Sequence, residues 1–263
     1  MRLPLAFAVL FALLLPSRQV DARLAEQVID IPTRPGVTQR FLFIRPPQAT
    51  AALVLFAGGH GGLQISAEGR IGWGAGNFVV RMRQQFAEQG FAVAVVDAPS
   101  DRQSPPYLSG FRQTPEHAAD IKAVIAWLRQ QTRLPVWLIG TSRGTQSAAY
   151  VATQLATGDG PDGLVLTSTI LTDPKSRAVP ELPLQKLAIP VLVVHHRQDG
   201  CELCQFRDLP LLMGKLDTLP RKELIAIDGG QDRGDPCEAM AHHGFNGVEA
   251  VVVARIADWI RGK

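Results

Sequence analysis

The feature that most constrains this chain is an apolar run that leads directly into a Gly-x-Ser-x-Gly pattern. Residues 136–139 read Val-Trp-Leu-Ile, residues 140–144 read Gly-Thr-Ser-Arg-Gly, and an alanine-rich helical pattern follows at residues 147–152. A strand, a sharp turn and a helix in this order hold the serine in a strained backbone conformation with its hydroxyl exposed. The flanking glycines are expected because a Cβ there would collide with the neighbouring strand or helix. The pattern therefore predicts that Ser142 is a nucleophile.

Strand-like and helix-like segments alternate along the rest of the chain. Strands are expected at residues 28–31, 39–44, 51–57, 91–96, 136–139, 163–167, 191–195 and 222–227. Helices are expected at residues 77–89, from residue 115 through 128, after the serine turn, and at residues 203–215 and 248–261. The first two strands should form an antiparallel hairpin. Because most of the others are continuously apolar, they indicate a mostly parallel sheet with helices on both faces.

Length and composition are typical of one folded unit preceded by a short leader. The 263 residues, 46% hydrophobic and 19% charged, can bury one sizeable core, so residues 23–263 are expected to form a single catalytic domain. Residues 1–22 differ: Arg2 is basic, residues 3–15 are apolar, and residues 20–22 fit a small-residue cleavage site. This predicts a secretory signal peptide and a secreted or periplasmic product, with an uncleaved N-terminal anchor as the alternative.

The charge balance argues against a polyanionic partner. The chain has 27 basic and 24 acidic residues, and removal of residues 1–22 leaves 25 and 23, a net charge of +2. There is no basic run and no interleaving of aromatic and basic residues, so we expect no nucleic-acid partner. We also expect no membrane contact after signal cleavage, and the partner that remains is a small molecule.

The order of these features resembles that of the α/β-hydrolases, and specifically of compact secreted bacterial serine hydrolases. A glycine-rich loop at residues 58–62, the Gly-Thr-Ser-Arg-Gly turn, a late acid and a final histidine follow one another as in that superfamily. The resemblance covers residues 31–261. It implies the α/β-hydrolase fold, with a mostly parallel central sheet and helices on both faces. The connection between residues 170 and 190 is too short for a large lid domain.

The resemblance also implies an acid at the end of a late strand. Asp199 lies just beyond residues 191–195 and is the preferred acid. Asp173, after the strand at residues 163–167, is an alternative position used by some hydrolases. Asp228 and Asp232 are weaker alternatives. The acid would hold the imidazole tautomer and stabilise the imidazolium.

The base is expected in the loop between the last strand and the closing helix. His243 is followed by Gly-Phe, which best matches the His-Gly pattern of the superfamily. His242 stays open, because adjacent histidines point in different directions and the sequence does not say which one faces Ser142.

The glycine-rich loop is expected to present backbone donors to the oxyanion. Glycines let the main chain approach the substrate, so one donor is assigned to Gly59 or His60 and the other to the N–H of Arg143. A phosphate cradle is the alternative, but the loop lacks the Lys-Ser/Thr ending of a P-loop.

The three cysteines allow either a metal site or a disulfide. Cys201 and Cys204 form a C-x-x-C pattern with histidines nearby, which would suit a metal. Behind a signal peptide a disulfide is the better expectation. We predict Cys201–Cys237, with Cys204–Cys237 as the alternative, because the first pair flanks Asp199 and His243. We expect no metal and no cofactor.

The function expected from this set is a serine hydrolase that cleaves carboxylic esters through a Ser-His-Asp triad and an acyl-enzyme intermediate. A peptidase or a lactone hydrolase would use the same triad, and a catalytically silent binding protein is the alternative from another class. Residues 97–113 should form a surface loop. Its side chains Arg102, Tyr107, Phe111 and Arg112 are expected to be solvated, with substrate contact as the alternative.

Overall fold

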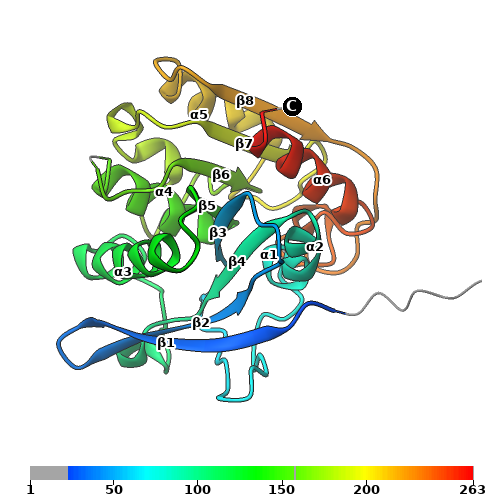
Figure 1. Cartoon of the computed structure of the whole chain (residues 1–263). Coiled ribbons are helices and arrows are strands. Elements are labelled where there is room, and N and C mark those ends of the chain that lie inside the picture. The colour runs from blue at the N-terminus through cyan, green and yellow to red at the C-terminus, as the bar shows by residue number, and fades with distance from the viewer. Residues whose placement is uncertain (1–22, 157, 263) are drawn as a thin grey trace, which may run out of the picture.

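The computed structural model describes residues 23–262 except residue 157. The predicted signal peptide, residues 1–22, lies outside the described residues. The described chain forms one eight-stranded sheet in the order β1-β2-β4-β3-β5-β6-β7-β8 (Figure 1). The strands are β1 (Glu26–Arg34), β2 (Val37–Ile44), β3 (Ala51–Phe56), β4 (Phe91–Val96), β5 (Val136–Thr141), β6 (Gly163–Thr167), β7 (Val191–His196) and β8 (Lys222–Ile227).

The sheet is mostly parallel, as the apolar runs predict. Strand β1 pairs with β2 and β2 pairs with β4 in antiparallel fashion, whereas all pairs from β4 to β8 are parallel. Phe56 at the end of β3 pairs with Val96 of β4 and with Gly140 of β5. Thr141 of β5 in turn pairs with Thr167 of β6. The carboxyl ends of these strands therefore meet at one edge, where parallel sheets place their ligands.

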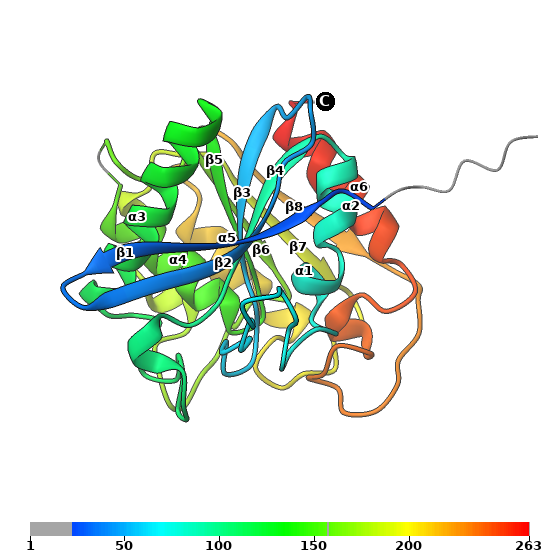
Figure 2. The ribbon, with the colours of Figure 1, turned by 60° about the horizontal axis from the view of Figure 1, so that its bottom comes forward.

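Helices cover both faces of the sheet (Figure 2). Helices α3 (Pro115–Thr132), α4 (Gly144–Gln154) and α5 (Leu209–Lys215) lie on one side, and α1 (Phe78–Arg81), α2 (Arg83–Glu88) and α6 (Glu249–Ile260) lie on the other. None of the helices among the described residues is long and apolar enough to cross a membrane.

Each central strand supplies side chains to two separate cores. In β3, Val54 and Phe56 pack in the core under α3 and α4, whereas Leu53 and Leu55 pack in the core under α1 and α6. This alternation is the period-two geometry of a strand, and burial on both sides explains why these strands read as uninterrupted apolar runs. Burying one such side chain contributes about 1.5–3 kcal/mol, so the two cores fix the sheet that carries the site.

Two predicted helices differ from the structure. The helix expected over residues 77–89 is broken at Met82 into α1 and α2. The helix expected to begin at residue 203 begins at Leu209, after a 3-10 turn at Phe206–Asp208. Pro210 explains the later start, because proline lacks an N–H and is tolerated in the first turn of a helix but not in its interior.

The connection between β6 and β7 carries no lid domain. It contains two short 3-10 turns, Val179–Glu181 and Leu184–Lys186, among the described residues. Both turns pack against the core on the α4 and α5 side, and Val179 and Leu184 are fully buried there.

Candidate active site

Ser142 lies at the tip of the turn between β5 and α4. Its φ is +52°, in the left-handed region that side chains other than glycine rarely adopt, which costs on the order of 1–3 kcal/mol. The backbone N–H of Ser142 donates to the carbonyl of Thr167 at 3.0 Å, which ties the turn to β6. A Cβ on Gly140 would lie 2.4 Å from the carbonyl oxygen of Gly144, and one on Gly144 would lie 2.1 Å from that of Phe56. Both glycines are therefore required by the packing of the turn.

Asp199 and His243 are brought together from the loops that follow β7 and β8. His243 Nδ1 lies 2.9 Å from Asp199 Oδ2 and 3.2 Å from Oδ1, and both residues are buried. An ionised carboxylate only accepts hydrogen bonds, so the proton of the imidazole resides on Nδ1. The Oγ of Ser168 donates to the carbonyl of His243 at 2.6 Å, and a Cβ on Gly244 would lie 2.0 Å from the carbonyl oxygen of Ala239. The close contact explains why glycine follows this histidine.

A second histidine supports the carboxylate. His195, the penultimate residue of β7, is fully buried, and its Nε2 lies 3.5 Å from Asp199 Oδ2 while it donates to the carbonyl of Cys204 at 2.6 Å. Burial opposes ionisation of Asp199, but the hydrogen bonds from His195 and His243 outweigh it and lower the pKa to about 2. Asp199 is thus a carboxylate at neutral pH. The sequence shows His195 at the end of a strand but gives no sign of its contact with Asp199.

His243 Nε2 is buried and has no hydrogen-bond partner among the described residues. His243 lines a pocket of about 330 Å³ together with Ser142, Arg143 and Gly59. The pocket therefore brings an imidazole and a serine on a strained turn to one place. Hydrogen bonds between such groups are often long before a substrate binds.

The alternative base lies elsewhere. The ring of His242 stacks on that of His196 at 4.2 Å between ring centroids, nearly parallel to it. The backbone N–H of His242 donates to Asp232, which places this acid beside His242. The structure therefore brings His243, and not His242, to Asp199.

The other alternative acids have different partners. Asp173 accepts hydrogen bonds from Arg143 at 2.7 Å, from Gln146 at 3.0 Å and from Ser176 at 2.6 Å. Burial opposes its ionisation, but these bonds and the N–H of Lys175 lower its pKa to about 2. Asp228 pairs with Arg197 at an exposed position. The structure places none of these carboxylates against His243.

The glycine-rich loop contacts the serine turn directly. A Cβ on Gly58 would lie 2.9 Å from the Cβ of Ser142, and Gly59, with φ +54°, lines the pocket. The ring of His60 lies against the rings of Trp73 and Tyr107, with distances of 3.6 and 4.3 Å between ring centroids. Among the described residues, no protein acceptor is bonded to the N–H groups of Gly59, His60 or Arg143. Three unpaired donors thus lie on the two segments that flank Ser142.

Tyr107, Phe111 and Arg112 are not solvated, which corrects the expectation for these three side chains. Phe111 and Arg112 are each 5% exposed, and the guanidinium of Arg112 reaches the carbonyls of the glycine-rich loop. Tyr107 is half-buried against His60, and of the four side chains considered in the sequence Arg102 alone is exposed. The correction follows from a contact between segments about 50 residues apart, which a local pattern does not encode.

Two further residues of the pocket were missed in the sequence. Asn77 lines it with a buried side-chain oxygen that has no partner among the described residues, and Trp73 lines it while 36% exposed. Asn77 precedes α1 and was visible only as a helix start. Neither position carries a motif that could have identified it.

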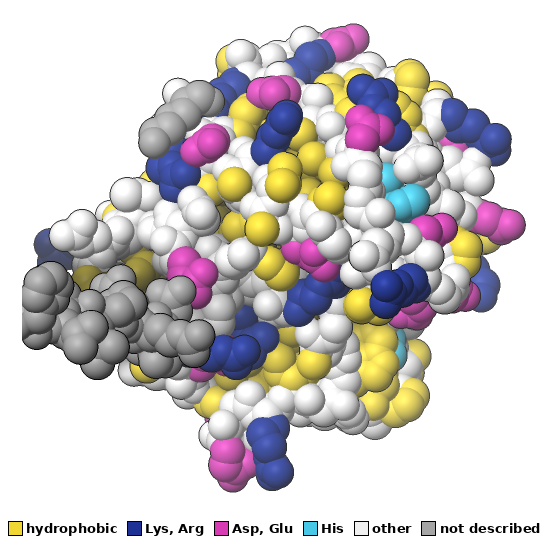
Figure 3. All heavy atoms as spheres, turned by 90° about the vertical axis from the view of Figure 1, so that its right-hand side faces the viewer, with side chains coloured by type: hydrophobic (Ala, Val, Ile, Leu, Met, Phe, Trp, Pro, Cys, Tyr) yellow, Lys and Arg dark blue, Asp and Glu magenta, His cyan; other side chains and the backbone are white. Residues whose placement is uncertain are grey.

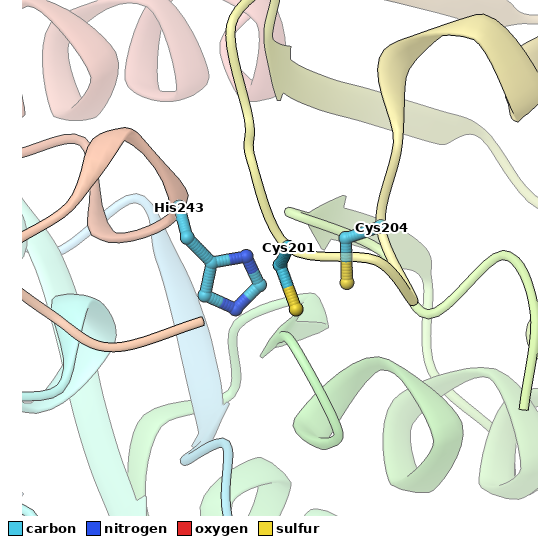
Figure 4. Close-up of side chains that lie close together, drawn as sticks. All are labelled: Cys201, Cys204 and His243. Atoms are coloured by element: carbon cyan, nitrogen blue, oxygen red, sulfur yellow. The ribbon is translucent and has the colours of Figure 1, made fainter. Parts of the chain in front are cut away.

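Cys201 and Cys237 form a disulfide that joins the acid loop to the histidine loop. Cys204 is free and buried. Figure 4 shows the ring of His243 directed toward Cys201, with Cys204 farther along the same loop, and candidate ligand atoms of the three residues lie within 4.8 Å of one another. Cys201 offers no thiolate while it is in the disulfide, and burial raises the pKa of the Cys204 thiol. The trio therefore lacks the thiolates that zinc prefers.

One face of the molecule mixes both signs of charge. On the face shown in Figure 3, basic and acidic side chains are interspersed, and histidine side chains reach the surface.

Of the comparisons with known proteins, only the one with solved structures finds similar proteins. No family model matches the chain, and no curated protein sequence matches it. Among solved structures, it is similar to a dienelactone hydrolase from Anabaena variabilis, with a TM-score of 0.60 and 15% identity over 92% of this chain and 99% of that one. It is also similar to an esterase from Pyrococcus furiosus, with a TM-score of 0.64 and 13% identity over 90% and 91% of the two chains. An α/β serine hydrolase without lid from Xanthomonas campestris matches with a TM-score of 0.53 and 19% identity over 89% and 95%. The chain therefore has the α/β-hydrolase fold.

Proposed function

We propose that this protein is a serine hydrolase that cleaves carboxylic esters of small molecules through a Ser142-His243-Asp199 triad. The observation that carries the proposal is the position of His243. Its Nδ1 lies 2.9 Å from the Asp199 carboxylate, its Nε2 has no hydrogen-bond partner among the described residues, and the residue lines the same pocket as Ser142. In the proposal, the carboxylate on Nδ1 fixes the tautomer of the imidazole, and Ser142 on its strained turn supplies the nucleophilic hydroxyl.

In the first half of the proposed reaction, Ser142 Oγ attacks the ester carbonyl carbon while His243 Nε2 takes its proton. The resulting imidazolium is stabilised by Asp199, and the tetrahedral oxyanion accepts hydrogen bonds from the N–H groups of Gly59 and Arg143. His243 then protonates the leaving alcohol, and an acyl-enzyme remains on Ser142. A water molecule, deprotonated by His243, attacks this ester, and the carboxylic acid is released.

The pocket fits a small acyl group. Its volume of about 330 Å³ is at the lower end of the range for ligand sites, and Phe78, Ile170 and Leu203 supply apolar walls. Solved structures of similar fold include proteins named esterase and dienelactone hydrolase, which supports ester or lactone carbonyls as the substrate class. An amide would be cleaved by the same triad, so an assay has to separate esters from amides.

A fluorophosphonate probe tests the proposal, because such a probe phosphonylates only a serine that is activated as a nucleophile. We expect labelling of the wild type, no labelling of Ser142→Ala, and turnover of short p-nitrophenyl esters by the wild type alone. Aminoacyl amides assayed in parallel would show whether amides are cleaved. A folded wild type that retains a ligand without turnover or labelling would instead identify a binding protein.

We also propose that residues 23–263 act as one exported catalytic domain, in the periplasm or outside the cell. The support is the pattern of residues 1–22 and the disulfide, which suits an oxidising compartment.

A further inference from the structure

Arg112 is a buried cation that binds the back of the glycine-rich loop. It is 5% exposed, and its Nη2 donates to the carbonyl oxygens of Ala57 at 3.0 Å and Gly59 at 3.1 Å, with a longer contact to Gly58 at 3.4 Å. The next carbonyl, that of His60, accepts from the backbone N–H of Leu108 at 3.0 Å. Four consecutive carbonyls of the loop are therefore bound by one segment, residues 108–112.

Binding these carbonyls orients the donors on the opposite side of the loop. In a trans peptide, the C=O of one residue and the N–H of the next point in opposite directions. With the carbonyls of Gly58 and Gly59 directed at Arg112, the N–H groups of Gly59 and His60 are directed away from it. Gly59 lines the Ser142 pocket, and neither N–H has a protein acceptor among the described residues. The guanidinium thus aims unpaired donors away from the loop interior.

The same side chain ties the loop to the helix that follows the nucleophile. Nη1 of Arg112 donates to Ser147 Oγ on α4 at 2.8 Å. Arg143, which immediately precedes α4, carries the other candidate oxyanion donor. Gly61 leaves room for this bridge, because a Cβ there would lie 2.5 Å from Arg112 Nη2. One planar group with several donors can hold two segments at a fixed separation, which a lysine cannot do.

The charge of Arg112 has no acidic partner among the described residues. Burial, and to a lesser extent the nearby Arg143, lowers its pKa to about 9, so it is still protonated at neutral pH. A buried charge without a counter-ion is costly unless it is fully hydrogen-bonded. The loop carbonyls supply those bonds. The positive charge behind them favours the negative charge that develops on the other side of the same peptides.

We propose that Arg112 is a positioning residue for the oxyanion hole: it holds the glycine-rich loop against α4 with the Gly59 N–H group directed toward the Ser142 pocket. This inference rests on the proposed function. It predicts a selective effect, because the donors contribute more to the tetrahedral intermediate than to the bound ester.

The test compares Arg112→Met, which removes the charge and the fork of donors, with Arg112→Lys, which keeps only the charge. Arg102→Met is the matched control, since Arg102 is exposed on the same loop with its guanidinium 4.8 Å from the Phe111 ring centroid. We expect Arg112→Met to lower kcat about a hundredfold with KM little changed, a loss comparable to that of one oxyanion-hole donor. Arg112→Lys should be intermediate, and Arg102→Met should behave as the wild type.

Affinity for an alkylboronic acid separates positioning from general stability. A boronate forms a tetrahedral, negatively charged adduct on an active serine, so its affinity should fall in parallel with kcat across the variants. Tm and far-UV circular dichroism identify variants that fail to fold. If Arg112→Met fails to fold, the kcat and boronate affinity of Arg112→Lys test the inference instead. Unchanged kcat and boronate affinity in a folded Arg112 variant would overturn the inference, as would losses that only follow Tm. A wild type without turnover or labelling would instead refute the proposed function.

Discussion

His243 Nδ1 and Asp199 Oδ2 lie 2.9 Å apart although the residues are separated by 44 positions in the chain. They belong to loops that leave β7 and β8, and the Cys201–Cys237 disulfide joins the same two loops two residues after the acid and six before the histidine. The geometry of the pair therefore depends on two neighbouring parallel strands and one covalent link. The predictions below test these parts separately.

Substitutions of the adjacent residues His242 and His243 should have very different effects on kcat. His243→Ala should lower kcat by about three orders of magnitude or more, because it removes the base. His242→Ala serves as the control and should have a small effect, since its ring stacks on His196 outside the triad. Steady-state kinetics on a p-nitrophenyl ester measure both. Greater loss in His242→Ala would transfer the role of base to His242.

Substitutions of Asp199 and Asp173 should have different effects on kcat. Asp199→Asn should lower kcat by about 10⁴, because an amide favours the wrong tautomer of the imidazole. Asp173→Asn should act mainly on KM and Tm, since Asp173 binds Arg143, Gln146 and Ser176. Steady-state kinetics measure kcat for both variants. A larger fall of kcat in Asp173→Asn than in Asp199→Asn would contradict the choice of Asp199 as the acid.

Acid should destabilise the protein through these carboxylates. The pKa of Asp199 is lowered from 3.8 to about 2, so its stabilising contribution is present above pH 3.8 and is lost as the pH falls toward 2. Asp173 acts in the same direction and window. The free energy of unfolding, from urea titrations at several pH values, should fall across this range by on the order of 2 kcal/mol for Asp199. Asp199→Asn should show a smaller fall than the wild type, and an equal fall would contradict the assignment.

Reduction of the disulfide should affect activity before it affects folding. The link closes a loop with a sequence separation of 36, which in the chain-entropy description contributes roughly 3–4 kcal/mol. Loss of the link frees the loops of Asp199 and His243, and a misplacement of about 1 Å can cost on the order of a hundredfold in rate. Mild reduction should therefore lower kcat while far-UV circular dichroism stays nearly unchanged.

Peptide mapping without reduction tests which cysteines form the disulfide. It should show the Cys201 and Cys237 peptides linked and Cys204 free. Three free thiols in freshly exported protein, or stoichiometric zinc whose removal abolishes activity, would contradict the disulfide.

The exported protein should begin near Arg23. The basic, apolar and small-residue parts of residues 1–22 are typical of a cleaved signal peptide. The intact mass of protein recovered from the cell envelope measures this directly. A mass that includes residues 1–22 would indicate an N-terminal anchor.

The sequence by itself determined most of the secondary-structure elements and the set of candidate catalytic residues. These predictions rest on local patterns: apolar runs, the Gly-x-Ser-x-Gly turn and glycines that end helices. Such patterns can be read from the sequence because backbone geometry and burial act over a few residues. For that reason the parallel sheet and the serine turn were predictable, as was the short connection without a lid. The sequence also narrowed the base to two histidines and the acid to four carboxylates.

Only the tertiary structure shows which of these side chains lie together. His243 faces Asp199, whereas His242 stacks on His196, because the chain turns between two adjacent residues. Likewise Arg112, in a segment that reads as a surface loop, is buried against the carbonyls of residues 57–59. Such contacts join segments tens of residues apart, so they are fixed by the packing of the whole sheet and its helices, and no local pattern of residues encodes them.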